Sequence, residues 1–364
     1  MISERAYWVA WSQARGLGPV LLKRLHSHFG SLARAWQAEG HELLEVEGIG
    51  LGVGCTLLEY RQSVYPLQLL GERERQSPNF WTPADPEYPA LLFEITDPPP
   101  LLYYRGRPEL VQALKTLPAV AVVGTREPSA YGQSWTRRLV QQLVAHNIIV
   151  VSGLARGIDR QAHAQALASG GLTIGVLGTG VDQVYPLANR DLQAQIAEAG
   201  LLLSEYANGT PPDRGHFPRR NRIIAGLSRQ VVVTEAPQRS GALITARLAN
   251  DYGRDVFALP GSLDNPCSAG CLDLIAQGAQ MVLAETTLIE ELGRFPCLPS
   301  TASPPPSLAQ ELAEVLAAIA QEPVSVDHLS RDLAKPTGEL LSSLAQLELM
   351  GLITLLPGMR YQRC

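Results

Sequence analysis

Apolar positions between residues 118 and 293 form short continuous runs, and longer segments with helical spacing separate them. The runs are Ala119–Val123, Ile148–Val151, Thr173–Leu177, Leu201–Leu203, Gln230–Val233 and Asp255–Leu259. The helical segments include Ser129–Ala145, Ile158–Ala168 and Ala242–Tyr252. Apolar strands bridged by helices are typical of a parallel sheet covered on both faces. The pattern therefore predicts an α/β, doubly wound, Rossmann-like domain, whose ligands bind outside the carboxyl ends of the strands.

Residues 1–75 have the pattern of short helices and predict a small helical domain of the helix-hairpin-helix or SAM-like kind. Two Gly-x-Gly turns, Gly16-Leu17-Gly18 and Gly48-Ile49-Gly50, each lie between apolar helical patterns. In a helix-hairpin-helix, such glycines let a helix N-terminus approach a DNA phosphate. A helical hairpin with a purely structural role gives the same short pattern, so both interpretations stay open.

Prolines recur between Pro78 and Pro100. Because proline removes a backbone donor and clashes with the preceding helical turn, we expect no helix here. We expect instead an extended segment that packs on a neighbour and leads into the Rossmann-like domain, which would span residues 76–295.

Residues 296–307 are rich in Pro and Ser and predict a linker. The later pattern predicts three helices followed by two short strand-like pieces. They are placed at Leu308–Ala320, from Val324 onward, at Pro336–Met350 and within Leu352–Arg363 around Pro357-Gly358. Three helices and a hairpin are typical of a winged helix, which we expect over residues 308–364.

Composition limits the class of protein. A hydrophobic fraction of 46% and a charged fraction of 18% are typical of a soluble globular protein. We see no signal peptide and no apolar run long enough to span a membrane. Five scattered cysteines indicate a reducing cytoplasm. We expect a cytoplasmic protein with no metal and no cofactor, because Cys267 and Cys271 lack the partners of a four-ligand site.

Basic charge is concentrated in one stretch of an acidic chain. The net charge is −5, yet Arg214, Arg219, Arg220, Arg222 and Arg229 follow one another with no acidic residue among them. Arginine forks match phosphate geometry, and the interleaved Phe217 offers a stacking face for a base. Flanking Ile and Leu residues anchor the stretch to a packed element, which a loose solvated loop would not need. The stretch predicts contact with single-stranded nucleic acid.

Small residues follow three consecutive predicted strands, in the sequences Gly124-Thr125-Arg126, Ser152-Gly153-Leu154-Ala155-Arg156 and Gly178-Thr179-Gly180. They let backbone N–H groups reach a phosphate, and helix N-termini favour anions. Tight turns alone would explain any one of these glycines, but three such ends beside the arginines favour a phosphate-rich ligand. A mononucleotide or dinucleotide cofactor is disfavoured, because the first turn lacks the Gly-x-Gly-x-x-Gly fingerprint.

Together these motifs resemble the DNA-processing protein A (DprA, or Smf) family. Further matching stretches are His216-Phe217-Pro218, Asn221–Ser228, Ser240–Ala246, Pro260-Gly261 and Ser268–Cys271. The resemblance is strong over residues 78–293 and looser elsewhere. It implies a bacterial cytoplasmic protein that binds and protects single-stranded DNA in natural transformation. It also implies loading of the RecA recombinase and a homodimer formed through the Rossmann-like domain. Family members usually have Ser at the position of Thr125. Threonine is a mild departure from this pattern, because it keeps the hydroxyl group.

The candidate DNA-binding residues divide by expected role. Those expected to contact phosphates are Arg126, Arg219, Arg220 and Arg222, and Phe217 is expected to stack on a base. Backbone or hydroxyl donors are expected from Gly124, Ser152 and Gly153, and Asn221 is expected to bond a base or fix the loop. Thr125 and Arg156 complete the set.

We expect no enzyme, because no nucleophile–base pair is visible. Asp159 and Glu235 follow strand ends, where a lone carboxylate more often orients a loop. The alternative is a Rossmann-like nucleotide hydrolase of the nucleoside-monophosphate phosphoribohydrolase type. Such enzymes carry a Pro-Gly-Gly-x-Gly-Thr loop, which Glu235–Gly241 replaces here, and this replacement argues against the enzyme.

Overall fold

The computed structural model describes residues 3–292, 310–319, 324–333, 335–349, 352–356 and 360–363. The linker expected at residues 296–307 and the turn expected at Pro357-Gly358 lie outside the described residues. The chain divides into two compact units, Met1–Arg294 and Phe295–Cys364. Each unit is described by itself.

The first unit begins with short helices, as the sequence predicts. They are α1 (Glu4–Ser12), α2 (Pro19–Phe29), α3 (Leu32–Gln37), α4 (Gly40–Leu44), α5 (Leu51–Ser63) and α6 (Pro66–Gln76). The two glycine turns pack reciprocally. A Cβ on Gly48 would lie 2.8 Å from Leu21 of α2, and Gly16 faces Val53 of α5. Both glycines have positive φ, +92° and +85°, which disfavours any other residue at these positions.

The proline-rich segment contains a helix, so the expectation of no helix there was wrong. The helix α7 (Ala90–Glu94) lies between β1 (Phe80–Trp81) and β2 (Leu102–Gly106). Pro89 occupies its N-cap, where a missing N–H costs no helical hydrogen bond. The five helical residues contain no proline, and Leu92 among them is fully buried. Packing of this apolar side chain stabilises a helix too short to form alone.

The described strands of the first unit form one sheet in the order β1-β2-β6-β5-β4-β3-β7-β8-β9. Its parallel strands are β3 (Ala119–Val123), β4 (Ile149–Ser152), β5 (Thr173–Leu177), β6 (Leu201–Ser204), β7 (Gln230–Val233), β8 (Asp255–Ala258) and β9 (Gln280–Met281). The chain moves outward from β3 to β6 and then returns to β7 on the other side of β3. The ends of β3 and β7 thus form the topological switch point, where such sheets bind ligands.

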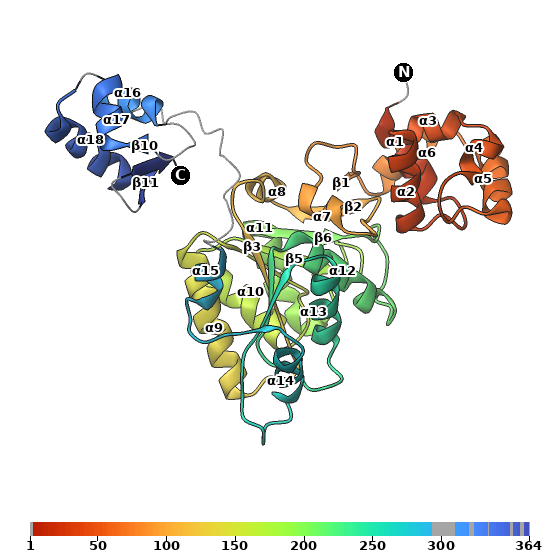
Figure 1. Cartoon of the computed structure of the whole chain (residues 1–364). Coiled ribbons are helices and arrows are strands. Elements are labelled where there is room, and N and C mark those ends of the chain that lie inside the picture. Colours follow the sequence, from red (N-terminus) through yellow and green to blue (C-terminus); the bar gives the residue numbers. More distant parts are fainter. Residues whose placement is uncertain are drawn as a thin grey trace. The chain divides into compact units, whose positions relative to one another are not determined.

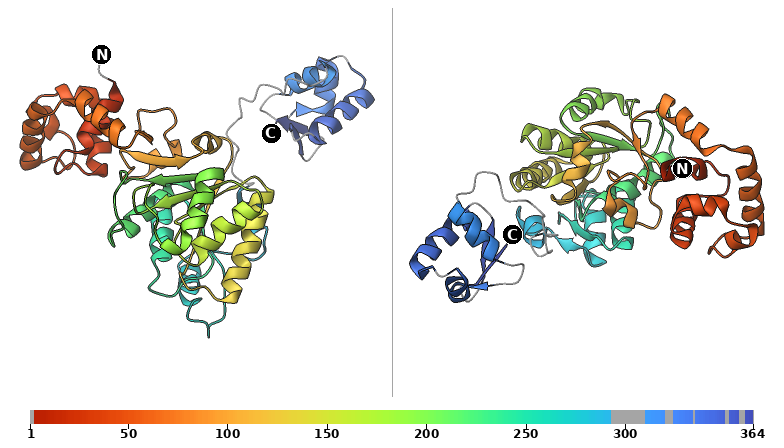
Figure 2. Two further views of the ribbon diagram at one scale, coloured as in Figure 1. Left: turned by 180° about the vertical axis from the view of Figure 1, so that it is seen from behind. Right: turned by 90° about the horizontal axis from the view of Figure 1, so that it is seen from above.

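Helices cover both faces of the sheet (Figures 1 and 2). One layer consists of α9 (Ala130–Ala145), α10 (Ile158–Ala168), η1 (Leu187–Asn189), α11 (Arg190–Ala199) and α15 (Thr287–Leu292), and the other of α8 (Glu109–Ala113), α12 (His216–Leu227), α13 (Gly241–Asp251) and α14 (Ala269–Ala276). Along β3, Val120 and Val122 pack into one core, whereas Ala121 and Val123 pack into the other. This two-sided burial explains the continuous apolar strands and confirms the predicted doubly wound fold.

The second unit has helices α16 (Gln310–Ala318), α17 (Val326–Asp332) and α18 (Thr337–Leu349). Its strands β10 (Val324–Ser325), β11 (Ile353–Leu356) and β12 (Arg360–Arg363) pair in the order β10-β12-β11. The second helix begins at Val326, later than expected, because the Ser325 hydroxyl caps it by accepting the His328 N–H. These elements agree with the predicted winged helix. Across both units, no described helix is long and apolar enough to cross a membrane.

Candidate nucleic-acid interface

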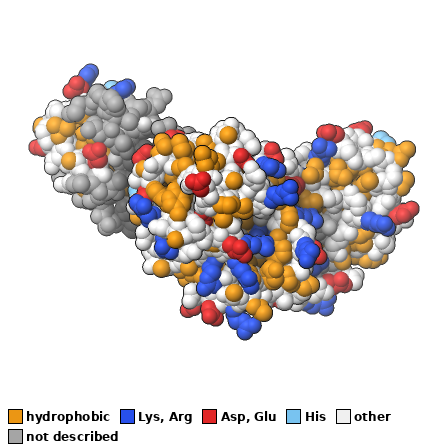
Figure 3. All heavy atoms as spheres, turned by 90° about the horizontal axis from the view of Figure 1, so that it is seen from below, with side chains coloured by type: hydrophobic (Ala, Val, Ile, Leu, Met, Phe, Trp, Pro, Cys, Tyr) orange, Lys and Arg blue, Asp and Glu red, His pale blue; other side chains and the backbone are white. Residues whose placement is uncertain are grey.

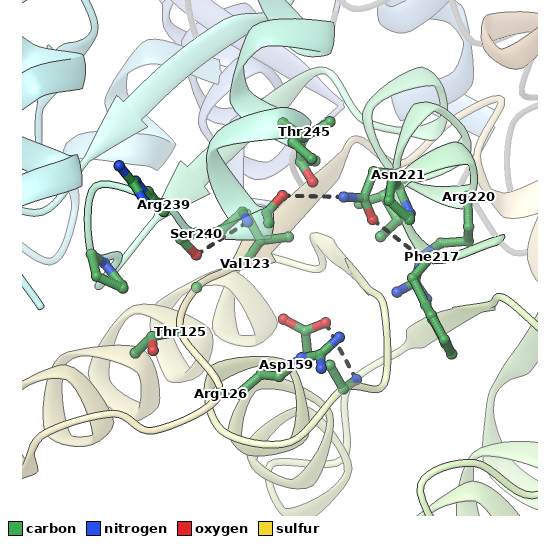
Figure 4. Close-up of a pocket in the computed structure, with 18 of the residues that line it drawn as sticks. Val123, Thr125, Arg126, Asp159, Phe217, Arg220, Asn221, Arg239, Ser240 and Thr245 are labelled. Carbon is green, nitrogen blue, oxygen red and sulfur yellow. Dashed lines mark hydrogen bonds between the residues drawn. The ribbon is translucent and has the colours of Figure 1, made fainter. Parts of the chain in front are cut away.

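A hollow of about 590 Å³ opens at the switch point between β3 and β7. Its walls come from the end of β3, the first turns of α12 and the loop that leads into α13. Arginine and lysine side chains gather on the face shown in Figure 3. Arg126, Arg239 and Arg220 line this hollow from three different elements, and Figure 4 labels all three. The predicted position of a ligand site and the observed cavity therefore coincide.

Helix α12 splits the arginine stretch between two faces. Phe217, Arg220, Asn221 and Ile224 line the hollow, as residues three and four apart on a helix do. Arg219 and Arg222 do not line it, because they occupy the opposite face of the same helix. The sequence predicts that Arg219, Arg220 and Arg222 lie on one phosphate-binding surface, whereas the structure divides them between two faces of α12.

Arg220 forms the buried floor of the site. Its Nη1 donates to the carbonyl oxygens of Gly153, at 2.6 Å, and Val176. Burial lowers the pKa of Arg220 to about 10, and the negative charge of Asp159 opposes that shift. The guanidinium thus stays charged at neutral pH. It adds positive potential behind the hollow, while carbonyl groups take much of its hydrogen-bonding capacity.

Asp159 lies in the first turn of α10, and its carboxylate accepts the Ala155 N–H at 3.3 Å. Burial raises its pKa, whereas the positive charge of Arg220 acts against the shift. The carboxylate therefore orders the loop after β4 and compensates the buried guanidinium.

Arg222 lies away from the hollow, contrary to the expected phosphate contact. Only 3% of its side chain is exposed, and Glu205 and Asp97 pair with its guanidinium at 2.7 Å and 3.2 Å. Arg219 is 53% exposed and shares the Glu205 carboxylate at 3.4 Å. Buried and paired with two carboxylates, the Arg222 guanidinium is not accessible to a phosphate in this arrangement.

The exposed cations of the site include two residues outside the predicted set, Arg214 and Arg239. Arg126 is exposed and lines the hollow, as expected, together with Arg214 and Arg239. Arg214 belongs to the arginine stretch, but Arg239 is isolated in sequence. Its position next to Ser240, which caps α13, is the signal that could have identified it, because anions bind at helix N-termini.

A second hollow of about 750 Å³ adjoins the first, and Arg126, Ala155, Tyr185, Phe217 and Arg220 line both. Its other walls are mostly apolar residues and backbone, including Leu154, Leu177, Gly178, Pro186 and Leu187, and the exposed Arg156 also lines it. The Tyr185 and Phe217 rings lie 5.2 Å apart, and Tyr185 is 40% exposed. Two accessible aromatic rings suit base stacking. The sequence predicted Phe217 for this role and missed Tyr185.

The small residues at the strand ends permit close packing. A Cβ on Gly124 would lie 2.6 Å from the Ile158 side chain. Only glycine avoids this clash. The Ser152 hydroxyl is fully buried and donates to the Val122 carbonyl at 2.6 Å, so this hydroxyl is already bonded within the protein. Thr125 lines the hollow, and its backbone N–H donates to the Glu235 carbonyl.

Glu235 binds groups of the protein itself. Its carboxylate accepts the Ser129 N–H at 2.8 Å, the Ser129 hydroxyl at 2.6 Å and the Asn265 amide at 3.0 Å. Glu235 is 1% exposed and does not line the hollow. It fixes the start of α9 against β7, the loop-orienting role that the sequence favours for a lone carboxylate. Among the described residues, no cluster of His, Cys, Asp and Glu could hold a metal ion.

Comparison with known proteins identifies the family. The family model of DNA recombination-mediator protein A matches residues 79–293, and that of the DprA winged helix domain matches residues 299–359. The chain is 46% identical to protein Smf of Synechocystis sp. over 395 residues, which covers 99% of both chains. The chain belongs to the DprA/Smf family.

Solved structures of the DprA/Smf family agree with the fold. DprA from Streptococcus pneumoniae is 37% identical, with a TM-score of 0.67, and the match covers 80% of this chain and 98% of that one. DNA processing protein A from Helicobacter pylori is 33% identical, with a TM-score of 0.53, over 58% of this chain and 95% of that one. The H. pylori structure concerns the single-stranded DNA binding mode of that protein.

Proposed function

We propose that this DprA/Smf protein is a recombination mediator that binds single-stranded DNA at the two adjoining hollows. The observation that carries the proposal is the meeting of Arg126, Arg214 and Arg239 with the Tyr185 and Phe217 rings at the switch point. Exposed guanidinium groups neutralise phosphates, whereas accessible rings need unpaired bases. The single-stranded DNA binding described for the H. pylori relative supports the same ligand.

A comparison of the affinities for single-stranded and duplex DNA tests this proposal. The first unit, residues 1–294, should bind a single-stranded oligonucleotide more tightly than duplex of equal length. Contacts to about four phosphates would give a log–log salt slope near −3 for single strands. Equal affinity for duplex, or affinity independent of salt, would contradict the proposal.

We also propose that the protein protects the bound strand, loads the RecA recombinase onto it and acts as a homodimer. Family membership supports these roles. A nuclease-protection assay, a RecA filament-formation assay on strands coated with single-strand-binding protein and a mass measurement in solution test them one by one. Unchanged RecA filament formation in the presence of this protein would remove the loading role only.

A nucleotide-hydrolysing enzyme is not favoured. The Glu235 carboxylate is occupied by Ser129 and Asn265 and cannot serve as a general base in the hollow without losing those bonds. We propose a protein with no enzymatic activity. Release of a base or of phosphate from nucleotides, lost in a point variant of a hollow-lining residue, would overturn this.

A further inference from the structure

The guanidinium of Arg222 joins three parts of the first unit. Nη2 contacts Glu205, which follows β6, and Nε contacts Asp97, which follows α7. Asp97 is fixed in turn by the Tyr252 hydroxyl, which donates to its Oδ1 at 2.9 Å. We call Asp97, Arg222 and Glu205 the carboxylate clamp.

The segment that carries Asp97 is itself held from the N-terminal helices. Lys23 of α2 donates to the carbonyl oxygens of Glu94, at 3.0 Å, and Ile95, at 2.7 Å. Lysine donors at the last carbonyls of a helix are favourable, and here they secure the C-terminal end of α7. Asp97 therefore presents its carboxylate to α12 from a fixed position.

The clamp and the proposed DNA site lie on opposite faces of one helix. Arg222 and Gly226 face α7 and Glu205, and a Cβ on Gly226 would come within 2.8 Å of Leu92. Phe217, Arg220 and Asn221 face the hollow. A rotation of α12 about its axis, or a shift along it, would therefore move the residues of the clamp and those of the hollow together.

We infer that Arg222 is a positioning residue for nucleic-acid binding, and that the carboxylate clamp sets the rotation of α12 that aims Phe217 and Asn221 into the hollow. This inference rests on the proposed single-stranded DNA binding. The planar guanidinium can pair with two carboxylates at fixed angles, which a lysine ammonium cannot reproduce. Removing it would leave Asp97 and Glu205 as two like charges without their shared cation.

Salt dependence separates a positioning residue from a phosphate contact. Losing a phosphate contact makes the log–log slope shallower by about 0.7, whereas a misaligned aromatic removes base stacking and leaves the slope unchanged. The test variants are Arg222→Met and Asp97→Asn. Asparagine keeps an acceptor for the Tyr252 hydroxyl, and Asp97 is 30% exposed, so this variant is the milder one. Arg229→Met, in the same arginine stretch, is the control for loss of one positive charge.

Each protein is titrated with a thymidine oligonucleotide and with an abasic strand of equal length, at several salt concentrations. We expect the clamp variants to lose about tenfold affinity for the thymidine strand, within the range of base stacking. Their affinity for the abasic strand and both slopes should stay near those of the wild-type protein. Arg229→Met should retain the base-dependent difference.

Three outcomes would overturn the inference. A shallower slope in Arg222→Met would make Arg222 a phosphate contact. A reduced active fraction with unchanged dissociation constants would make the clamp purely structural. Unchanged base dependence in a folded Asp97→Asn protein would also exclude positioning by the clamp, even if Arg222→Met does not fold. Failure of the proposed function is distinguishable, because the wild-type protein would then bind neither strand.

Discussion

The Arg220 guanidinium lies directly against Gly153, so that a Cβ at position 153 would come within 2.6 Å of Nη2. A flexible arginine could normally move aside. Here its hydrogen bonds to the carbonyls of Gly153 and Val176, and its burial, hold it in place. The absent side chain at position 153 is therefore a requirement of the buried cation behind the hollow.

Gly153→Ala should destabilise the protein and weaken DNA binding, because either Arg220 or the loop after β4 must shift. Overpacking of this kind costs about 1–3 kcal/mol of unfolding free energy, measurable by urea denaturation. Gly71→Ala is the matched control, since nothing lies within 4 Å of its new Cβ, and it should not lower stability. A Gly153→Ala protein as stable as the wild type would show that Arg220 relaxes freely.

Arg126→Ala should weaken single-strand binding without unfolding the protein, because Arg126 is exposed at the mouth of both hollows. Its log–log salt slope should become shallower by about 0.7, as measured by fluorescence anisotropy at several salt concentrations. Ile223→Ala is the contrast, since Ile223 is fully buried and its truncation should cost about 2–5 kcal/mol of stability. Normal DNA binding by Arg126→Ala would place the site elsewhere.

Stability should fall as pH decreases below about 6.5, partly because of His163. This side chain is fully buried, and burial lowers its pKa from 6.5 to about 3, with the Arg220 charge acting in the same direction. The unfolded chain takes up a proton below pH 6.5 while the folded chain does not. Each pH unit between 6.5 and 3 therefore removes up to about 1.4 kcal/mol through this residue.

Urea denaturation at pH 7, 6 and 5 measures this loss. His163→Gln should flatten the pH dependence, whereas substitution of the exposed His146 by Gln should leave it unchanged. Equal pH dependence in all three proteins would assign the loss to other groups.

Removal of the winged helix should leave single-strand affinity within a few-fold, about 1 kcal/mol. Its third helix carries Glu339 and Glu348 and no basic residue, whereas groove binding needs cations. Leu340, Leu344 and Leu347 are fully buried, which confirms them as core. Comparison of the full chain with one ending at residue 305 measures the effect. A loss of tenfold or more, with the truncated protein folded, would make the winged helix a principal DNA-binding module.

The strands were predictable because two-sided burial makes each of them apolar throughout, as β3 illustrates. The helix α7 was not, because its stability depends on packing of Leu92, which composition does not show. The division of domains at residues 75 and 296–307 stays a prediction.

Helical spacing alone separates Arg219 and Arg222 from Phe217 and Arg220. The sequence could not say which face lines the hollow, since the carboxylates that pair with Arg222 belong to other elements, Asp97 after α7 and Glu205 after β6. Tyr185 and Arg239 lie outside the arginine stretch, and of the two only Arg239 carries a signal in the sequence, its place beside the Ser240 cap of α13. The structure thus shows which carboxylate pairs with which arginine, and these pairs determine which guanidinium groups remain exposed.

The Glu235 carboxylate limits where a phosphate of a DNA strand can bind at this edge of the sheet. Its carboxylate already occupies the electropositive start of α9, so the protein provides its own anion there. A phosphate approaching the sheet edge meets a filled position beside Ser129 and would be repelled from it. At the neighbouring start of α13, the cap is the uncharged Ser240 hydroxyl, and the cation Arg239 lies beside it. For the proposed DNA ligand, the start of α13 is therefore the expected position of a phosphate, whereas the start of α9 already holds the Glu235 carboxylate.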